Sequence, residues 1–266
     1  MPLFYKHQLS VFDSMYHFWK PVIQPLLETM RPKRILEIGA DEGIHSRVLA
    51  EYCLEQGAVF HIIEPMPRFD PEALGSPDRV VFHRDLSLRV LPHLPPVDVA
   101  LVDGDHNWYT VINELRLLRR TAHESGRLTP VIACHDGCWP YARRDLYYGP
   151  ETIPDECRLP WERAGMVRGQ DELAPDSGLN ARLCNAISEG GPQNGVLTAI
   201  EDFLSDTAES IELTLIPASY GLAILAPRSR LDVHEGLETL ISTWTTDEGF
   251  LDIQHQLEEH TAETVV

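Results

Sequence analysis

The stretch Arg34-Ile-Leu-Glu-Ile-Gly-Ala-Asp-Glu-Gly43 decides the fold of this 266-residue chain. Its first six residues are typical of a buried strand that ends at a glycine turn. The glycines at positions 39 and 43 allow a tight turn and a close approach of the backbone to a ligand. Residues 44–54 follow with Val48, Leu49 and Tyr52 at helical spacing. The sequence therefore predicts a strand, a glycine turn and a helix in direct succession.

The same alternation continues toward the C-terminus. Further strands are expected at residues 58–63, 79–82, 97–102 and 130–134, with a helix at 108–121. These strands alternate with helices and form no hairpin, which indicates βαβ units and a parallel sheet whose strands are apolar on both faces. A short helix at 196–204 then precedes a hairpin of residues 211–216 and 221–225.

We expect a single domain over residues 1–266, with a helical N-terminal segment at 1–33 and a helical, acidic tail at 231–266. The tail is expected to be a solvated helix that packs on the edge of the fold or on a partner. Within residues 12–19, aromatic side chains either roof the cofactor or pack in the core.

Residues 137–195 are rich in Pro, Gly, Arg and Tyr and have weak periodicity. A loop this long is uncommon in a compact domain unless it is a lid or a substrate-binding insertion, which is the role we predict. Its aromatic side chains are candidates for an acceptor pocket, and an ordered loop that closes the core is the alternative. They are Trp139, Tyr147 and Tyr148.

Composition limits the partners. The chain has 22 basic and 41 acidic residues, a formal net charge of −19, and this field repels nucleic acid and anionic membranes. The densest basic stretch, at Arg116, Arg119 and Arg120, is too small to offset it. Five cysteines without a C-x-x-C pair predict free thiols in a reducing compartment. No apolar run approaches membrane-helix length, so we expect a cytoplasmic protein.

Polar residues follow each predicted strand. In an open parallel sheet, ligands bind outside the carboxyl ends of the strands, so these residues should gather on one rim. Several carboxylates there cannot all stay ionised unless a cation neutralises them or one takes up a proton. The rim comprises Glu37, Gly39, Glu64, Asp85, Asp103, Asp105, His106, His135 and Asp136.

The glycine turn indicates the class of cofactor. It is not G-x-G-x-x-G, and it places Asp41 and Glu42 where a dinucleotide would put its phosphates. S-adenosylmethionine suits it better, because this ligand has an adenosine and a sulfonium but no phosphate. Glu64, at the end of the second strand, can accept hydrogen bonds from both ribose hydroxyls. Alternatively, Glu37 and Glu64 cap helices or pair with arginines.

Two motifs carry a family resemblance. Leu36–Gly43 looks like motif I of the class I S-adenosylmethionine-dependent methyltransferases. Leu101–His106, followed by Glu114 in a helix, resembles the "DGDH" signature of one branch, which contains macrolide and aminocoumarin sugar O-methyltransferases and relatives of cephalosporin hydroxylase. The resemblance covers residues 34–136 and the terminal hairpin. It implies a Rossmann-like α/β fold with a mostly parallel seven-stranded sheet and an antiparallel terminal hairpin strand.

The resemblance also implies roles for individual residues. Asp103, His135 and Asp136 would hold a divalent metal, and Asp105 would be the general base, with His106 as runner-up, or His135 if no metal binds. His135 departs from the pattern, which has an acid there, and an imidazole suits Zn, Fe or Mn better than Mg²⁺. The cofactor would be held by Glu37, Gly39, Ala40, Gly43, Glu64, Asp85 and Asp103.

We therefore expect methyl transfer from S-adenosylmethionine to a hydroxyl of a small molecule, with or without a divalent metal. A secondary metabolite or a sugar is the expected acceptor, which places the chain in natural product biosynthesis, as a monomer or a homo-oligomer. One alternative is a metal-dependent, hydroxylase-like enzyme on the same fold. The other is a non-catalytic protein that binds S-adenosylmethionine.

Overall fold

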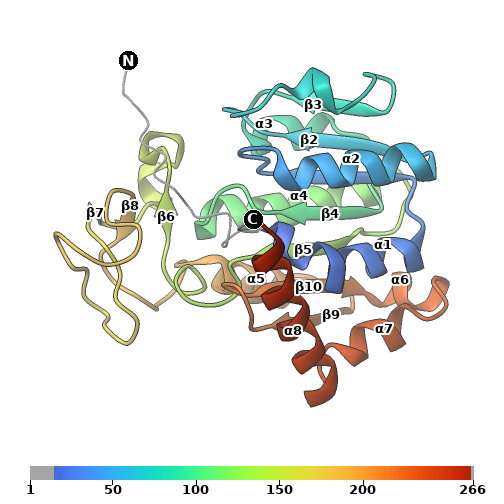
Figure 1. Cartoon of the computed structure of the whole chain (residues 1–266). Coiled ribbons are helices and arrows are strands. Elements are labelled where there is room, and N and C mark those ends of the chain that lie inside the picture. Colours follow the sequence, from blue (N-terminus) through green and yellow to red (C-terminus); the bar gives the residue numbers. More distant parts are fainter. Residues whose placement is uncertain (1–14, 265–266) are drawn as a thin grey trace.

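The computed structural model describes residues 15–264, with side chains as far as residue 257. Seven strands form one sheet in the order β3-β2-β1-β4-β5-β10-β9, in which only β10 runs antiparallel to its neighbours (Figure 1). The predicted mostly parallel sheet with an antiparallel hairpin strand is thus confirmed. The strands are β1 Arg34–Ile38, β2 Val59–Ile63, β3 Val80–His83, β4 Val99–Val102, β5 Val131–His135, β9 Ile211–Ile216 and β10 Leu222–Pro227.

The helices predicted after the first and fourth strands and before the hairpin are α2 Ile44–Gln56, α4 Trp108–Glu124 and α5 Val196–Asp206. Five further α-helices are α1 Gln24–Met30, α3 Ser87–Val90, α6 Arg228–Val233, α7 Leu237–Thr243 and α8 Asp247–Thr264. Short 3-10 or π turns are η2 Met15–Phe18, η3 Trp19–Ile23, η4 Pro71–Leu74, η5 Leu91–His93, η6 Pro150–Thr152 and η7 Asp155–Cys157.

Both faces of the sheet are buried, and adjacent strand residues belong to different cores. Ile35 packs with α1, α2 and α7 on one face, whereas Leu36 packs with α4 and α5 on the other. Consecutive strand side chains point to opposite faces, so two cores favour apolar residues at successive positions. This explains why the strands read as largely apolar runs, although Glu37 and His61 are buried polar residues within them.

The tail packs more deeply than expected. Leu237, Ile241 and Trp244 are buried in the same core as α1 and α2, and α8 adds Ile253 and Leu257 to it. The tail therefore packs on the fold itself, one of the two expected alternatives, and its apolar side chains are more deeply buried than those of a solvated edge helix would be. The tail contains few apolar residues, and their burial depends on the face left open by α1 and η3, which the tail sequence does not show.

The N-terminal segment is helical from Met15 onward, and the predicted residues 1–14 lie outside the described part of the chain. Phe18 is fully buried in the core, and the rings of Trp19 and His45 meet edge to face at 6.0 Å. Core packing therefore accounts for the described part of the aromatic segment, whereas Phe12 falls outside it.

The insertion has its own secondary structure. Strands β6 Leu146–Tyr147, β7 Trp161–Arg163 and β8 Cys184–Ala186 form a small antiparallel sheet in the order β6-β8-β7. Figure 1 shows this sheet standing beside one end of the main sheet. Strands of two or three residues leave almost no periodic signal, which is why the sequence indicated only an irregular loop.

One buried carboxylate fastens both ends of the insertion to α4. Oδ1 of Asp145 accepts hydrogen bonds from the backbone N–H of Trp108 (2.7 Å) and of Gly195 (2.6 Å). Its Oδ2 accepts one from the Tyr147 hydroxyl (2.8 Å), and burial raises the pKa of Asp145 to about 6. The first helical turn after β4 and the closing residues of the insertion therefore share one acceptor.

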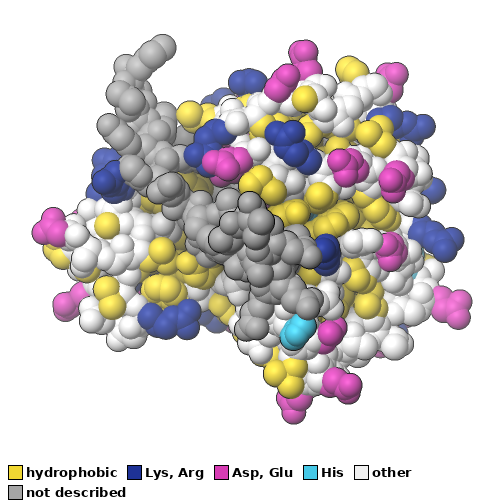
Figure 2. Space-filling view, in the orientation of Figure 1, with side chains coloured by type: hydrophobic (Ala, Val, Ile, Leu, Met, Phe, Trp, Pro, Cys, Tyr) yellow, Lys and Arg dark blue, Asp and Glu magenta, His cyan; other side chains and the backbone are white. Residues whose placement is uncertain are grey.

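The basic side chains of the densest basic stretch are paired with acids. Arg116 pairs with Asp206, Arg119 with Glu209 and Arg120 with Glu124, so the densest basic stretch is neutralised. Acidic and basic side chains are interspersed over the face shown in Figure 2. Within residues 15–264, no helix combines the length and the apolar character needed to cross a membrane.

We predict that Asp145→Ala lowers the free energy of unfolding by about 2–4 kcal/mol, because it leaves two buried N–H groups without an acceptor. Asp145→Asn is the matched control: its amide oxygen still accepts from both N–H groups, so the loss should be less than half as large. Urea denaturation measures both. Equal losses for the two variants would contradict the proposed anchoring role.

Candidate active site

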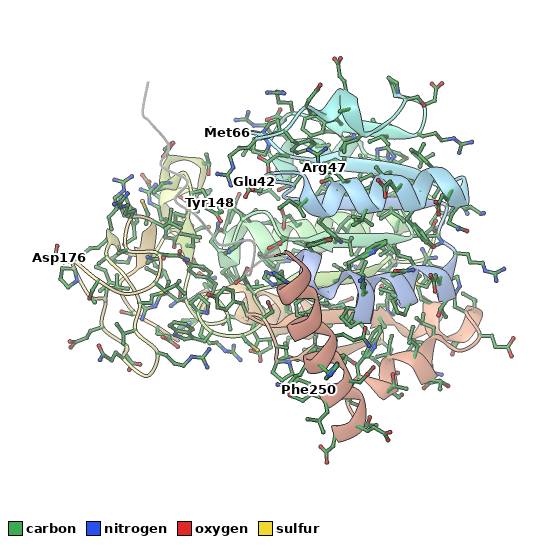
Figure 3. All side chains as sticks on the ribbon, in the orientation of Figure 1. Glu42, Arg47, Met66, Tyr148, Asp176 and Phe250 are labelled. Carbon is green, nitrogen blue, oxygen red and sulfur yellow. The ribbon has the colours of Figure 1, made fainter. Side chains whose placement is uncertain are left out.

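A cavity of about 1250 Å³ opens between the carboxyl ends of the main strands and the insertion. Figure 3 places Glu42 and Met66 at the end of the main sheet that faces the insertion, with Tyr148 on the insertion side. The predicted residues that line it are Glu37, Gly39, Ala40, Glu64, Asp103, Asp105, His106, Asp136, Tyr147 and Tyr148. Gly43, Asp85, His135 and Trp139 are not in its wall.

Both glycines of the turn adopt positive φ angles, as the predicted tight turn requires. Gly39 has φ +87°, and a Cβ added there would collide with the carbonyl oxygen of Asp103. Gly43 has φ +73°, and a Cβ there would lie 2.6 Å from the Phe69 ring. The close backbone approach expected for a ligand is thus also an approach between two loops of the protein.

Glu64 stabilises the glycine turn through hydrogen bonds to its backbone. Its Oε2 accepts hydrogen bonds from the backbone N–H groups of Ala40 and Asp41, both at 3.1 Å, and its Oε1 accepts one from Met66 N–H (2.8 Å). A carboxylate has about four lone-pair sites, so three bonds leave capacity for a ligand hydroxyl. The sequence placed Glu64 in the site but did not reveal that it also shapes the turn.

Glu37 is buried and binds two residues of the following helix. Its Oε1 lies 2.8 Å from His45 Nδ1, and its Oε2 accepts a hydrogen bond from the Ser46 hydroxyl. The alternative that Glu37 interacts with the start of a helix is therefore part of its role. His45 also lines the cavity, and sequence reasoning missed it because a single histidine after a glycine turn has no distinctive pattern.

The acids at the start of α2 are partly neutralised. Arg68 lies 2.8 Å from Asp41 and 2.9 Å from Glu42. Both carboxylates occupy the predicted place, but the repulsion that they exert on a phosphate is weaker than two free charges would give. The sequence could not show this pairing, because Arg68 is 27 residues from Asp41 along the chain.

Asp85 is placed away from the cavity. It accepts a hydrogen bond from Leu86 N–H (2.8 Å) and pairs with exposed Arg89. Leu86 and Ser87, the next two residues, form the wall instead. The chain turns into α3 directly after Asp85, so its side chain caps that turn and does not reach the ligand space.

Asp103, His135 and Asp136 gather at the ends of β4 and β5. Nδ1 of His135 lies 3.2 Å from Asp103 Oδ1 and 3.1 Å from Asp136 Oδ2. Their ligand atoms all lie within 4.8 Å of one another, as a metal site requires. The predicted meeting of these three residues is observed, and Asp136 adopts φ +59°, a rare conformation that tends to occur at functional sites.

The tautomer of His135 decides which of its two ring nitrogens can bind a metal cation. Its Nε2 lies 2.9 Å from the Ser219 carbonyl oxygen, which only accepts hydrogen bonds, so Nε2 carries a proton. Nδ1 then faces two carboxylates. Burial opposes the charged form, but the two carboxylates outweigh it and raise the pKa of His135. Nδ1 therefore holds a proton or a metal cation between them.

Of the two candidate bases, His106 lies beside this cluster. Its Nδ1 is 3.2 Å from Asp136 Oδ2, and its Nε2 is 3.8 Å from Asp103 Oδ1. Asp105 instead accepts a hydrogen bond from the Thr110 hydroxyl (2.9 Å), and burial raises the pKa of its carboxyl. Both residues line the cavity, but the structure separates them into different surroundings.

The insertion supplies an aromatic and basic wall. The rings of Tyr141 and Tyr148 meet the His106 ring edge to face at 5.4 and 5.6 Å. Arg163 and Arg182 also line the cavity, and neither forms an ion pair with another described residue. Trp139, a predicted pocket residue, instead lies under the guanidinium of Arg168 at 4.8 Å.

Glu114 is a buried acid of the wall that the sequence identified only as part of a motif. It is fully buried on α4, and neither carboxyl oxygen is aligned for a hydrogen bond with a described residue. Burial and the charge of Asp105 raise the pKa of Glu114 to about 8, against a weaker opposing effect of the Ser87 hydroxyl. Near neutral pH its carboxyl is therefore mostly protonated.

We predict that Glu114 makes folding pH-dependent. The pKa of Glu114 in the folded protein, about 8, lies above its ordinary value of 4.5. The contribution of Glu114 to the free energy of unfolding is therefore fully present below pH 4.5 and is lost as pH rises to about 8. Glu114→Gln should remove this dependence, which is on the order of a few kcal/mol. The control Glu124→Gln changes an exposed acid of the same helix.

Chemical denaturation across this pH range measures the effect. As pH rises, the free energy of unfolding of the wild type should fall relative to that of Glu114→Gln. The curves of this free energy against pH should stay parallel for the wild type and Glu124→Gln. Parallel curves for all three proteins would show that Glu114 titrates normally.

Residues 36–137, which contain β1 to β5 and most of the cavity rim, match a family model described as a methyltransferase domain. This part of the chain is therefore similar to a methyltransferase domain, in agreement with the expected resemblance to the class I S-adenosylmethionine-dependent methyltransferases. The finer assignment to the "DGDH" branch stays a prediction. No curated protein matches the chain in sequence.

Solved structures with a similar fold include three methyltransferases. PaMTH1 of Podospora anserina, bound to SAH, is 20% identical, with 76% of this chain and 74% of that chain covered and a TM-score of 0.44. TomG of Streptomyces achromogenes, an O-methyltransferase in complex with SAM, is 17% identical over 78% of each chain, with a TM-score of 0.45. An O-methyltransferase of Bacillus cereus in complex with SAH is 14% identical over 84% of each chain, with a TM-score of 0.44.

Proposed function

We propose that this methyltransferase transfers a methyl group from S-adenosylmethionine to a hydroxyl of a small molecule. The observation that carries the proposal is that one cavity joins two groups of residues. The first is the glycine turn between Glu37 and Glu64, and the second is the acid–histidine cluster at the ends of β4 and β5. A sulfonium held at the turn would therefore face a proton acceptor.

The cofactor end of the cavity favours a cation. Glu37, Glu64 and Asp103 all reach the cavity, and a sulfonium there gains attraction that a neutral thioether does not. After methyl transfer this attraction is lost, so the same charges favour release of the product. The acceptor capacity left on Glu64 suits the ribose hydroxyls.

In the reaction, the acceptor oxygen attacks the methyl carbon while the bond from carbon to sulfur breaks. The electron pair of that bond remains on sulfur, which becomes a neutral thioether. The hydroxyl proton must leave as the new bond from oxygen to carbon forms. We assign it to the imidazole of His106, because this ring lies beside the cluster, 3.2 Å from Asp136 Oδ2 and 3.8 Å from Asp103 Oδ1.

Asp105 remains the second candidate for the base. Its raised pKa makes it a stronger proton acceptor than an ordinary carboxylate, although Thr110 occupies one of its oxygens. Its place beside Glu114, rather than in the cluster, is the reason for preferring His106.

The cluster fits a divalent metal. Asp103, His135 and Asp136 would hold it, since Nδ1 of His135 is the nitrogen left to bind a cation. Such a metal supplies Lewis acidity that lowers the pKa of a bound hydroxyl. The nitrogen ligand favours Zn, Fe or Mn over Mg²⁺.

The acceptor end of the cavity is aromatic and basic. Tyr141 and Tyr148 can pack on a sugar or an aromatic ring, and Arg163 and Arg182 are available for an anionic group. We therefore propose an acceptor that carries a carboxylate or a similar anion away from its reacting hydroxyl. A secondary metabolite fits this description.

We predict that His106→Gln lowers turnover ~10²–10⁴-fold and leaves the affinity for S-adenosylmethionine within about twofold. Asp105→Asn is the matched variant, and its loss of turnover should be smaller. Mass spectrometry of methylated products measures the turnover of both variants.

The same assay tests the proposed class of acceptor, with pairs of compounds that present the same hydroxyl with either a carboxylate or an amide. The wild type should methylate the carboxylate compound of each pair faster than the amide.

Two other results are informative. If His106→Gln keeps its turnover and Asp105→Asn loses it, the base is Asp105. If the wild type binds S-adenosylmethionine but methylates nothing in a wide panel of hydroxylated acceptors, with or without added divalent metals, O-methyl transfer is the wrong reaction.

A further inference from the structure

His106, the residue assigned above to accept the proton, needs a fixed ring orientation that its polar contacts do not provide. Its Nδ1 lies 3.2 Å from Asp136 Oδ2, but this nitrogen has no aligned hydrogen bond with a residue of the described chain. The outer torsion of a histidine side chain has broad minima, so the ring turns unless neighbouring groups pack against it. A proton acceptor must lie within hydrogen-bond reach of the proton that it takes, so packing has to fix this ring.

Two tyrosines of the insertion pack on the His106 ring. The centroid of the Tyr141 ring lies 5.4 Å from that of His106 at an interplanar angle of 64°, and the Tyr148 ring lies 5.6 Å away at 77°. Aromatic rings attract each other in this edge-to-face arrangement, which fixes their mutual orientation. The carbonyl oxygen of His106 also accepts a hydrogen bond from Leu146 N–H (3.0 Å). The insertion therefore contacts both the ring and the backbone of His106.

Tyr141 is itself fixed by a buried hydrogen-bond network. Its hydroxyl accepts a hydrogen bond from Asn180 Nδ2 (2.7 Å) and donates one to Asn185 Oδ1 (3.3 Å). Asn185 is fully buried, and its Nδ2 donates to the carbonyl oxygens of Ala164 (2.8 Å) and Asn180 (3.0 Å). Tyr141 is only 2% exposed, so protein contacts surround almost the whole side chain. Its ring is therefore held firmly enough to hold a neighbour.

We propose that Tyr141 is a positioning residue that fixes the His106 imidazole for proton transfer. This inference rests on the proposed function, in which His106 accepts the proton. Tyr148 contacts the same ring but is only half-buried, so Tyr141 is the better-fixed of the two neighbours. Tyr141 acts through His106 and exchanges neither the proton nor the methyl group. The insertion then serves the proton-transfer step as well as the acceptor pocket.

The first test measures kcat and KM of Tyr141→Leu with the carboxylate compound that the wild type methylates fastest. Turnover should fall about 10- to 100-fold, because a displaced proton acceptor slows the chemical step. KM for the acceptor and the calorimetric affinity for S-adenosylhomocysteine should each change less than about threefold, because binding does not depend on the His106 ring. Tyr141→Phe keeps the ring and should recover about a third or more of the wild-type kcat.

A double-variant cycle separates positioning from a merely structural role. In the His106→Gln background, adding Tyr141→Leu should lower the remaining turnover less than about twofold, because the side chain that Tyr141 positions has been removed. A loss by the same factor in both backgrounds would show that Tyr141 acts independently of His106, and would overturn the proposal.

The control variant is Tyr109→Leu, which removes a partly buried ring of α4 that does not line the cavity. Its kcat should stay within about twofold of the wild type. If Tyr141→Leu does not fold, Tyr141→Met gives the same comparison, because its flexible side chain fills irregular space.

The remaining outcomes are distinct. An unchanged kcat in a folded Tyr141→Leu or Tyr141→Met overturns the proposal. If His106→Gln alone keeps its turnover, the proposal also fails, although methyl transfer itself stands. If the wild type methylates no acceptor, the proposed function fails, and the role of Tyr141 fails with it.

Discussion

The contact between Gly39 and the backbone of Asp103 is the constraint on which the site depends. A side chain at position 39 would collide with the Asp103 carbonyl, so only glycine allows the loops after β1 and β4 to meet. The loop after β1 carries the glycine turn that Glu64 holds. The loop after β4 carries Asp103, Asp105 and His106, and Asp103 belongs to the cluster with His135 and Asp136. In the proposed function, this close approach would bring a sulfonium bound at the turn within reach of a proton acceptor.

The parts of the fold that depend on local pattern were predictable. The strands from Arg34 to His135 are short and largely apolar because two cores cover the sheet, and this pattern also fixes which residues end each strand. The common rim follows from parallel topology alone. That is why Asp103, His135 and Asp136, which are 32 or 33 residues apart across the two strands, could be expected together.

The parts that depend on contacts distant in sequence were not predictable. Arg68 partly neutralises Asp41 and Glu42, and Asp145 binds the insertion to α4, but the spacing of these residues in the sequence predicts neither interaction. Asp85 was predicted to lie in the site, but it does not line the cavity. It ends a strand as the rule requires, yet the immediate turn into α3 uses its side chain as a cap. The end of a strand identifies a candidate, and the following turn decides its role.

The negative charge of the chain has different consequences in different places. On the surface, acids pair with arginines, whereas inside the cavity they are buried near one another and require a cation or a proton. The most direct measurement is therefore a calorimetric titration of the wild type with S-adenosylhomocysteine and, separately, with NADH. The account predicts saturable one-to-one binding of S-adenosylhomocysteine, at least ~100-fold tighter than any binding of NADH, whose phosphates meet the acids of the turn. Equal or tighter binding of NADH, or no binding of S-adenosylhomocysteine, would contradict it.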